Sequence, residues 1–187
     1  MKKGIILCGG KGTRMLPITR VMNKHMIPVL NKPMVLYPMQ TLMGMGVDDI
    51  LIVSGGNHIG QLAEFLGDGS EYGVTLTYKV QMEAGGIAQA LSLAEDFTKG
   101  EENFAVILGD NYFDEEIVPP GGCGIVLKQV HDPRRFGVYD AVTNTIEEKP
   151  RFSRGGSAVT GLYFYTPEIF KFIKTLEPSS RGELGNH

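Results

Sequence analysis

The sequence has few cysteines and no long apolar run. Its 187 residues include two cysteines, Cys8 and Cys123, which are too few for a disulfide framework and have no metal-ligand spacing. No stretch reaches the roughly eighteen consecutive apolar residues that a membrane span needs. The apolar run at residues 5–8 is too short for a signal peptide and predicts a buried first strand. We therefore expect a cytoplasmic protein in a reducing setting, with no membrane partner.

The composition excludes disordered and fibrous chains. Charged residues make up 21% of the sequence, hydrophobic residues 42%, and the mean hydropathy is −0.04, all ordinary values for a globular protein. The length suits a single domain over residues 1–187 that can bury a real core. Glycine is abundant, at 25 residues, and lies between strand-like and helix-like segments, which is typical of tight turns and ligand-binding loops.

Acidic residues are absent from the first quarter of the chain. Residues 1–47 carry seven lysines and arginines and no aspartate or glutamate, whereas residues 48–122 carry two basic and fourteen acidic residues. This asymmetry indicates either a solvated basic face or a site for an anion. Nucleic acid is disfavoured because the acidic middle would repel a long polyanion. A compact anion such as a nucleoside triphosphate fits better.

The first part of the chain alternates strand-like and helix-like segments. Apolar runs predict strands over 4–8, 50–53, 74–80 and 104–108, and helices over 33–45, 58–66 and 86–97, with Pro33 in a first helical turn. This order predicts an α/β fold with a mostly parallel sheet covered by helices on both faces. Ligands of such sheets bind beyond the carboxyl ends of the strands.

The second part is richer in short strands. We expect strands over 125–130, 136–141, 145–148 and 159–165, and a hairpin turn at Thr143-Asn144. A helix is expected over 167–176, with Thr166 as its N-cap. No linker divides the chain, so this part is expected to pack onto the same sheet.

A glycine-rich loop follows the first strand. In Gly9-Gly10-Lys11-Gly12-Thr13-Arg14 the glycines let backbone N–H groups turn toward a phosphate, and Arg14 with Lys24 can neutralise its charge. The loop has neither the Walker spacing nor the third glycine of a dinucleotide fingerprint. A tight turn without a ligand is the alternative.

Three further segments place polar or charged side chains, which could bind a ligand, at the ends of predicted strands. Asp110, after the strand at 104–108, is a hard-oxygen ligand of the kind that Mg²⁺ takes together with substrate phosphates. Glu148-Lys149 can offer an acceptor to a sugar hydroxyl and a cation to a phosphate. Gln81 can pair with the edge of a base. Each also has a plain structural interpretation, as a cap, a solvated strand edge or a surface amide.

Taken together, these segments resemble one known family. The blocks that carry the resemblance are LCGGKGTRM at 7–15, NKHMIPV at 23–29, NKPM at 31–34, GGIAQAL at 85–91, LGDN at 108–111, RFGV at 135–138, EEKP at 147–150, AVTGLYFY at 158–165 and RGEL at 181–184. In this combination and order the chain resembles the nucleotide-sugar pyrophosphorylases, and within them the glucose-1-phosphate thymidylyltransferase branch. The resemblance implies the family's Rossmann-like, three-layer fold with a mixed, mostly parallel sheet.

The resemblance implies a reaction and a nucleotide site. An oxygen of a sugar 1-phosphate attacks the α-phosphorus of dTTP or UTP in line, and pyrophosphate leaves, with Mg²⁺ as cofactor. Arg14, Lys24 and Asp110 match the family's catalytic positions, and Asp110 matches its metal ligand. The implied nucleotide-binding residues are Leu7, Gly9, Gly10, Gly12, Thr13, Arg14, Gln81 and Gly86.

The resemblance also implies a sugar-phosphate site and a division of the domain. The matching positions are Asn111, Gly137, Glu148, Lys149, Thr160 and Arg181. Residues 1–115 would form the nucleotide-binding half and residues 116–187 a shortened sugar-phosphate-binding half. Relatives commonly assemble, so a homo-oligomer is possible. The chemistry agrees with the absence of an evident serine or cysteine nucleophile, since nucleotidyl transfer needs positioning and charge screening more than acid–base groups.

The sequence departs from the family at its end. After the RGEL block the family continues into a segment that supplies a second metal-binding aspartate, whereas here residues 185–187 read Gly-Asn-His. With Asp110 alone, Mg²⁺ would depend on phosphate oxygens and water. Three interpretations remain open: an active nucleotidyltransferase, a shortened variant that binds nucleotide or nucleotide-sugar without efficient turnover, and a minimised fold without a ligand.

Overall fold

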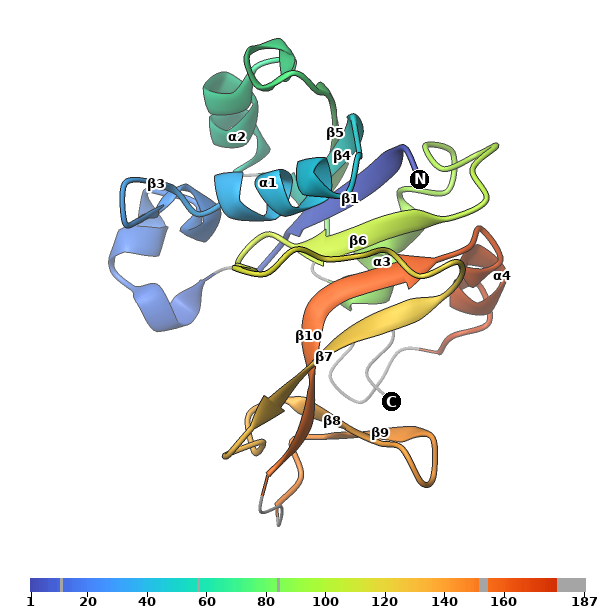
Figure 1. Ribbon diagram of the computed structural model, residues 1–187. Coiled ribbons are helices and arrows are strands. Elements are labelled where there is room, and N and C mark those ends of the chain that lie inside the picture. Colours follow the sequence, from blue (N-terminus) through green and yellow to red (C-terminus); the bar gives the residue numbers. More distant parts are fainter. Residues whose placement is uncertain (11, 57, 84, 152–154, 178–187) are drawn as a thin grey trace.

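The computed structural model describes residues 1–10, 12–56, 58–83, 85–151 and 155–177. Its central element is an eight-stranded mixed sheet with the order β5-β4-β1-β6-β10-β8-β9, in which β7 also pairs with β10 (Figure 1). The strands of this sheet are β1 (Lys3–Cys8), β4 (Asp49–Gly55), β5 (Thr75–Gln81), β6 (Phe104–Leu108), β7 (Gly124–Val130), β8 (Gly137–Asp140), β9 (Thr145–Glu148) and β10 (Gly156–Tyr165).

Short helices and one small hairpin complete the fold. The α-helices are α1 (Leu36–Gly44), α2 (Ile59–Leu66), α3 (Gly86–Ser92) and α4 (Ile169–Ile173). The 3-10 helices are η1 (Thr13–Met15), η2 (Ile18–Arg20), η3 (Lys24–Met26) and η4 (Ser70–Tyr72), and β2 (Pro28–Val29) pairs with β3 (Lys32–Pro33). The segment between β1 and α1 is therefore a series of short turns rather than a long helix.

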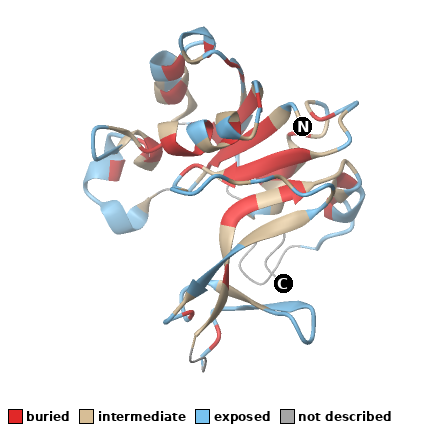
Figure 2. Cartoon of the chain, viewed as in Figure 1, coloured by how far each residue is buried: buried red, intermediate tan, exposed pale blue. Residues whose placement is uncertain are grey.

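The first half of the sheet is parallel, as the sequence predicts. β1 pairs with both β4 and β6, and β4 pairs with β5, all in parallel register. β1, β4 and β6 contain continuous apolar runs because both of their faces are covered, whereas the edge strand β5 alternates buried and exposed residues in part (Figure 2). Parallel strands end at the same edge, so Cys8, Gln81 and Leu108 lie along one border of the sheet.

Alternate residues of these strands feed two separate cores. Ile6 and Ile52 belong to the core that includes Leu42 of α1 and Leu62 of α2. Their neighbours Ile5, Leu7, Leu51 and Val53 belong to the core that includes Ala90 of α3 and Phe170 of α4. Because side chains along a strand alternate between faces, one apolar run serves both cores. The expected three layers, with helices on both faces of a mixed sheet, are confirmed.

The second half of the sheet is antiparallel and is organised by β10. This ten-residue strand pairs with β6, β7 and β8, and β8 continues into β9. The β8–β9 hairpin projects away from α1 and α2 (Figure 1). Its turn contains the predicted Thr143-Asn144, with Asn144 at a left-handed φ of 54° and the Asp140 carboxylate accepting from the Val142 N–H. The later part packs onto the same sheet, as expected.

Three helix predictions have wrong boundaries. Pro33 lies in β3 rather than in a first helical turn, because the next two N–H groups, of Met34 and Val35, donate to the Ile27 and His25 carbonyls. α3 ends at Ser92, five residues before the predicted end, and irregular turns follow. α4 spans only Ile169–Ile173, with Glu168 rather than Thr166 at the N-cap position.

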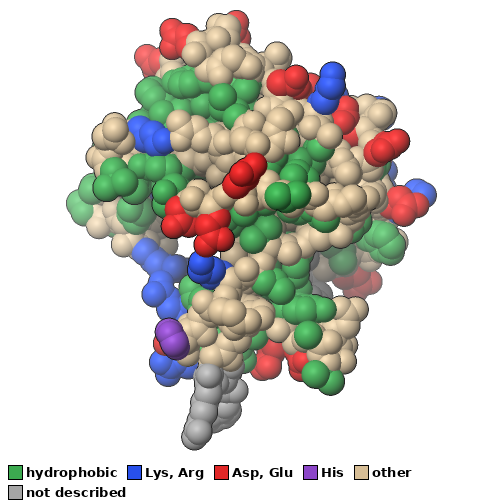
Figure 3. Space-filling model, in the orientation of Figure 1, with side chains coloured by type: hydrophobic (Ala, Val, Ile, Leu, Met, Phe, Trp, Pro, Cys, Tyr) green, Lys and Arg blue, Asp and Glu red, His purple; other side chains and the backbone are tan. Residues whose placement is uncertain are grey.

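No helix in the described ranges is long and apolar enough to span a membrane. The face of the molecule seen in Figure 3 carries charges of both signs. Among the side chains coloured in Figure 3, acidic and basic groups are interspersed with hydrophobic ones rather than forming one continuous basic stripe.

Candidate active site

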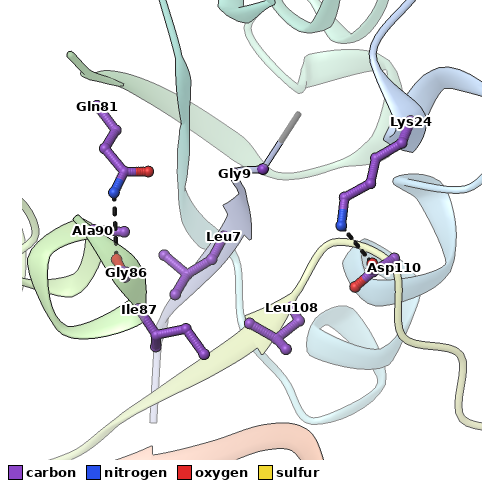
Figure 4. Close-up of a pocket in the computed structure, with 10 residues that line it drawn as sticks. Leu7, Gly9, Lys24, Gln81, Gly86, Ile87, Ala90, Leu108 and Asp110 are labelled. Atoms are coloured by element: carbon purple, nitrogen blue, oxygen red, sulfur yellow. Dashed lines mark hydrogen bonds and ion pairs between the residues drawn. The ribbon is translucent and has the colours of Figure 1, made fainter. Parts of the chain in front are cut away.

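A pocket of about 330 Å³ lies at the carboxyl edge of the parallel strands (Figure 4). Its walls come from the ends of β1, β5 and β6, the start of α3, and η3. The lining residues are Leu7, Gly9, Gly10, Lys24, Gln81, Gly86, Ile87, Ala90, Leu108 and Asp110. Several of the residues predicted to bind nucleotide or metal are thus brought to one place: Leu7, Gly9, Gly10, Lys24, Gln81, Gly86 and Asp110.

Lys24 and Asp110 form an ion pair at one end of this pocket. The Lys24 Nζ lies 2.6 Å from the Asp110 Oδ2, and their side chains are 21% and 44% exposed. Burial raises the pKa of Asp110, but the hydrogen bond and the charge of Lys24 outweigh it and hold that pKa below its usual value. Asp110 is therefore a carboxylate at neutral pH, ready to bind a cation.

The turn that carries Lys24 is held by Asn23 and His25. The Asn23 Oδ1 accepts from the His25 backbone N–H at 2.9 Å and lies 2.7 Å from the His25 Nδ1. An amide oxygen only accepts, so Nδ1 carries the proton and the Nε2 is the bare nitrogen. The His25 Nε2 is buried and has no hydrogen-bond partner among the described residues. Burial and the nearby Lys24 charge lower the pKa of His25 to about 3, so the ring is neutral.

The same turn is tied to the central strands. The Asn23 N–H donates to the Gln61 Oε1 of α2 at 2.9 Å, and the Asn23 Nδ2 donates to the Ser54 Oγ of β4 at 3.4 Å. The Ser54 hydroxyl in turn donates to the Cys8 carbonyl at 3.1 Å. Lys24 is thus fixed relative to the sheet through its neighbours, although its own side chain is partly exposed.

The other end of the pocket is formed by Gln81. Its side chain is 8% exposed, and its Nε2 donates to the Gly86 carbonyl at 3.3 Å and to the Gln89 Oε1. Gly86 has a φ of +88°, a backbone conformation that favours glycine at this position. Leu7, Ile87, Ala90 and Leu108 form an apolar floor between Gln81 and Asp110.

The rest of the glycine-rich loop lies outside the pocket lining. Gly12 is the N-cap of η1, and Thr13 and Arg14 lie within η1. Arg14 is exposed and has no hydrogen-bond or ion-pair partner in the described part of the chain. The basic residues of the first quarter are also dispersed. Lys3 bonds to the Phe97 carbonyl and pairs with Asp49, and Lys32 lies over the Tyr37 ring. The basic first quarter of the chain predicts several cations around an anion. Of the described lysines and arginines, however, only Lys24 lines the pocket.

A second pocket, of about 490 Å³, adjoins the first on the other side of α3. Ile87 lines both pockets. Gly137 and Glu148, from the β8–β9 hairpin, face Tyr163 and Tyr165 of β10 across it. The Glu148 carboxylate pairs with the Lys149 ammonium at 2.9 Å, and both side chains are about half exposed. Glu148 is therefore the one charged side chain among the described residues that line this pocket, and Lys149 lies beside it, outside the lining.

Two residues predicted to bind the sugar phosphate have hydrogen bonds within the fold. The Asn111 Oδ1 accepts from the Gly161 backbone N–H at 3.1 Å, and the Thr160 hydroxyl donates to the Val126 carbonyl at 2.7 Å. Neither residue lines the two pockets. Arg181 and Lys11 lie outside the described residues.

Several residues of the first pocket are not among those predicted from the motifs. Ile87, Ala90 and Leu108 form its apolar floor, and Gln89 bonds to Gln81. The signal for Leu108 was its place at the end of a strand next to Asp110. The helical spacing of 86, 89 and 90 could have pointed to one face of α3, since residues three and four apart are neighbours on a helix.

The donor set fits magnesium only in part. No group of three or more His, Cys, Asp or Glu side chains in the described ranges could hold a metal ion. Asp110 supplies an ionised hard-oxygen ligand, and the neighbouring Asn111 oxygen is already used by Gly161. Mg²⁺ commonly takes one or two carboxylates together with substrate phosphates and water, so Asp110 can serve when a triphosphate brings further oxygens.

Comparison with known proteins gives a consistent result. The chain is 42% identical, over 97% of its length, to the glucose-1-phosphate thymidylyltransferase of Neisseria meningitidis and spans 67% of that enzyme. A crystal structure of a candidate glucose-1-phosphate thymidylyltransferase from Bacillus anthracis, in complex with a sucrose, superposes with a TM-score of 0.90 at 46% identity, over 99% of this chain and 79% of that one.

A more distant structure shares the fold alone. UDP-glucose pyrophosphorylase complexed with UDP-glucose superposes with a TM-score of 0.80 at 24% identity, over 98% of this chain and 83% of that one. The sequence profile of the nucleotidyl transferase family matches residues 3–186, nearly the whole chain. The chain belongs to the nucleotidyl transferase family.

Proposed function

We propose that this protein joins a sugar 1-phosphate, with glucose 1-phosphate as the first candidate, to dTTP or UTP and releases pyrophosphate. The relatives at about 40% identity are glucose-1-phosphate thymidylyltransferases, and they share the order of the motifs along almost all of this chain. The proposal also rests on the two adjoining pockets, one suited to a nucleotide and one to a sugar phosphate.

The first pocket has the chemistry of a nucleotide site. The Lys24 Nζ would lie 3.9 Å from a Cβ on Gly10, so this ammonium is close to the exposed backbone of the glycine-rich loop. A phosphate placed there can take N–H donors and a cation together. A base fits at the other end, over the apolar floor and beside the Gln81 amide. We place Gly12, Thr13 and Arg14 on the outer phosphates.

The second pocket is proposed for the sugar phosphate. Glu148 lines this pocket and offers a carboxylate to sugar hydroxyls. Lys149 lies outside the lining, but its ammonium pairs with Glu148 and can reach a phosphate at the edge of the pocket. Both pockets meet at Ile87, so ligands in them can approach each other. On this basis residues 1–115 bind the nucleotide and residues 116–177 contribute most of the sugar pocket, with α3 serving both. Arg181, Asn111 and Thr160 remain predictions for the sugar-phosphate side.

The reaction needs little proton transfer. A phosphate oxygen of the sugar 1-phosphate, largely ionised at neutral pH because its second pKa is near 6, forms a new bond to the α-phosphorus. The bond from the α-phosphorus to the bridging oxygen of the β-phosphate breaks, and that oxygen takes the electron pair into the leaving pyrophosphate. The neutral His25 is not required as a base, and Lys24 stabilises the negative charge on the phosphates.

Asp110 would hold the magnesium ion that this family is expected to use. Such an ion screens the phosphate charge and favours the leaving pyrophosphate. The role of this chain is to keep Asp110 ionised and close to Lys24, so that carboxylate and ammonium flank the same phosphates. This ion pair within a pocket of glycine backbone is the observation that carries the proposal.

The test is an assay of products in both directions. Purified protein with Mg²⁺, dTTP and glucose 1-phosphate is expected to form nucleotide-sugar and pyrophosphate, and chelation by EDTA is expected to stop it. The reverse reaction, from nucleotide-sugar and pyrophosphate, gives an independent measurement of the same site. Binding of dTTP without any turnover in either direction would contradict the proposed transfer and support the binding-only alternative.

A further inference from the structure

Both amide hydrogens of Gln81 are committed within the protein. The Gln81 Nε2 donates to the Gly86 carbonyl at 3.3 Å and to the Gln89 Oε1. A side-chain amide has two hydrogens on its nitrogen and only acceptor sites on its oxygen. The remaining hydrogen-bonding group of this nearly buried side chain is therefore the Oε1.

The orientation of this amide follows from its neighbours. The Gly86 carbonyl can only accept, so the Gln81 atom that faces it must be the nitrogen. The 3.3 Å bond to Gly86 is long, so the bond from Gln89 supplies the second restraint. Without Gln89, one buried N–H would lack a partner, and the amide could rotate to satisfy it elsewhere.

The Gln81 oxygen faces the nucleotide pocket. Figure 4 shows the Oε1 pointing away from Gly86 toward the side where Gly9 lies. It would lie 3.1 Å from a Cβ on Gly9, so a side chain at that position would crowd this acceptor. A base in the pocket therefore meets a fixed acceptor. Uracil and thymine present a ring N–H at position 3 to such an acceptor, whereas cytosine presents a bare ring nitrogen.

We infer that Gln89 is a positioning residue that locks the Gln81 amide with its oxygen toward the base and so makes the site select a pyrimidine with a ring N–H over cytosine. This inference rests on the proposed nucleotide site and extends it, because it assigns base discrimination to a residue outside the pocket lining. With cytosine in the pocket, the Gln81 Oε1 would face a bare ring nitrogen and would have no hydrogen bond. An unpaired buried acceptor of this kind disfavours binding of cytosine.

The Gln89 side chain packs against Gly85. A Cβ on Gly85 would lie 2.9 Å from the Gln89 Cγ and 3.1 Å from its Cβ, so the Gln89 side chain lies directly against this glycine. Gly85 has a φ of −87°, a backbone conformation that alanine also adopts. Gly85→Ala therefore offers a way to displace Gln89 without altering Gln81 or straining the backbone.

The test compares dUTP with dCTP, which differ only at the pairing edge of the base. Affinities are measured by calorimetry with Mg²⁺ for wild-type protein and for the Gln89 variants. Wild-type protein is expected to prefer dUTP by about a hundredfold. Gln89→Met is expected to lower this ratio about tenfold, since it removes the acceptor, while Gln89→Glu keeps an acceptor oxygen and the wild-type ratio. Gln40→Met, the same change on the outer face of α1, is the control.

The outcomes separate the inference from the function it extends. A wild-type ratio that is unchanged in both Gln89→Met and Gly85→Ala would overturn the role of Gln89 and leave the nucleotide site intact. Wild-type protein that binds neither nucleotide would overturn the proposed site and this inference with it. If Gln89→Met does not fold, a lowered ratio in Gly85→Ala supports the inference and an unchanged ratio overturns it.

Discussion

The Lys24 ammonium and the Asp110 carboxylate lie 2.6 Å apart at the mouth of a pocket, and they come from opposite ends of the parallel half of the chain. In this arrangement the positive charge of Lys24 and the negative charge of Asp110 neutralise each other. A nucleotide with its metal would replace this contact on both sides, since phosphates attract the ammonium and the cation attracts the carboxylate. The ion pair thus holds two groups of the proposed phosphate site in place before any ligand binds.

Lys24→Met is expected to weaken dTTP binding. The substitution removes the only described cation in the pocket lining, and a charge-assisted contact of this kind contributes about 1.5–3 kcal/mol, which is a KM increase of about ten- to a hundredfold. Steady-state kinetics with varied dTTP measure it. Lys32→Met, which removes a lysine lying against Tyr37 outside the pocket, should leave the KM unchanged. Equal KM values in the two variants would exclude Lys24 from the phosphate site.

Arg14→Ala is expected to act on the outer phosphates. Arg14 is exposed, follows the glycine-rich loop and has no partner in the described part of the chain, so it is free to bind a ligand. We expect the affinity for dTTP to fall about tenfold and the affinity for dTMP to stay unchanged, because dTMP lacks the β- and γ-phosphates. Calorimetry measures both, with Arg20→Ala as a control at the next turn. An equal loss for dTTP and dTMP would place Arg14 elsewhere.

Asn111→Ala is expected to destabilise the fold. The Asn111 Oδ1 accepts from the Gly161 N–H in the middle of β10, and losing it leaves a buried donor without a partner, at a cost of about 1–3 kcal/mol. Asn111→Asp keeps an acceptor oxygen at this position and is expected to retain most of the stability. Urea unfolding of the three proteins measures the difference. Wild-type stability in Asn111→Ala would show that this hydrogen bond contributes nothing and leave the residue to sugar binding alone.

The stability of the fold is expected to fall as the pH drops from 7 to 5. Burial lowers the pKa of His25 to about 3, while the unfolded ring titrates near 6.5, so the unfolded chain binds the proton first. The free energy of unfolding should decrease by about 2 kcal/mol over this range. The aspartates whose pKa values are lowered stay ionised there: Asp68, Asp96, Asp110, Asp132 and Asp140.

His25→Gln provides the matched comparison for this pH effect. The glutamine amide does not titrate and can still donate to the Asn23 Oδ1, so this variant should lose most of the slope between pH 7 and pH 5. Urea unfolding at several pH values measures both proteins. The same slope in the variant as in the wild type would assign the pH dependence to another group.

Much of the parallel half of the fold could be predicted from the sequence. Continuous apolar runs such as 104–108 mark strands that are buried on both faces, and their carboxyl ends predict where Asp110 and the glycine-rich loop meet. The turns before α1 could not be predicted in this way. Pro33 lies in a two-residue strand because backbone N–H groups beyond it bond to residues 25–27, a tertiary contact that local pattern does not contain.

The chemistry of the site was predictable to a similar degree. Gln81 and Asp110 stand at strand ends, where a polar residue is informative, and both line the pocket. Gln89 gave no comparable signal, since a glutamine within an amphipathic helix is ordinary and its bond to Gln81 depends on how α3 packs against β5. The motifs predicted Asn111 and Thr160 as sugar-phosphate residues. In the structure their side chains bond to the backbone of neighbouring strands, and these bonds depend on the register of β10, which the sequence does not give.

The most direct test of the central claim is the rate of pyrophosphate release by Asp110→Asn, with saturating dTTP, glucose 1-phosphate and Mg²⁺. Asparagine keeps the size of the side chain and removes the charge that we assign to metal binding and to the pairing with Lys24. We predict turnover by the wild-type protein and a fall in kcat of about a hundredfold or more in the variant, because charge stabilisation is the main contribution to this kind of transfer. A variant that releases pyrophosphate at the wild-type rate would contradict the account.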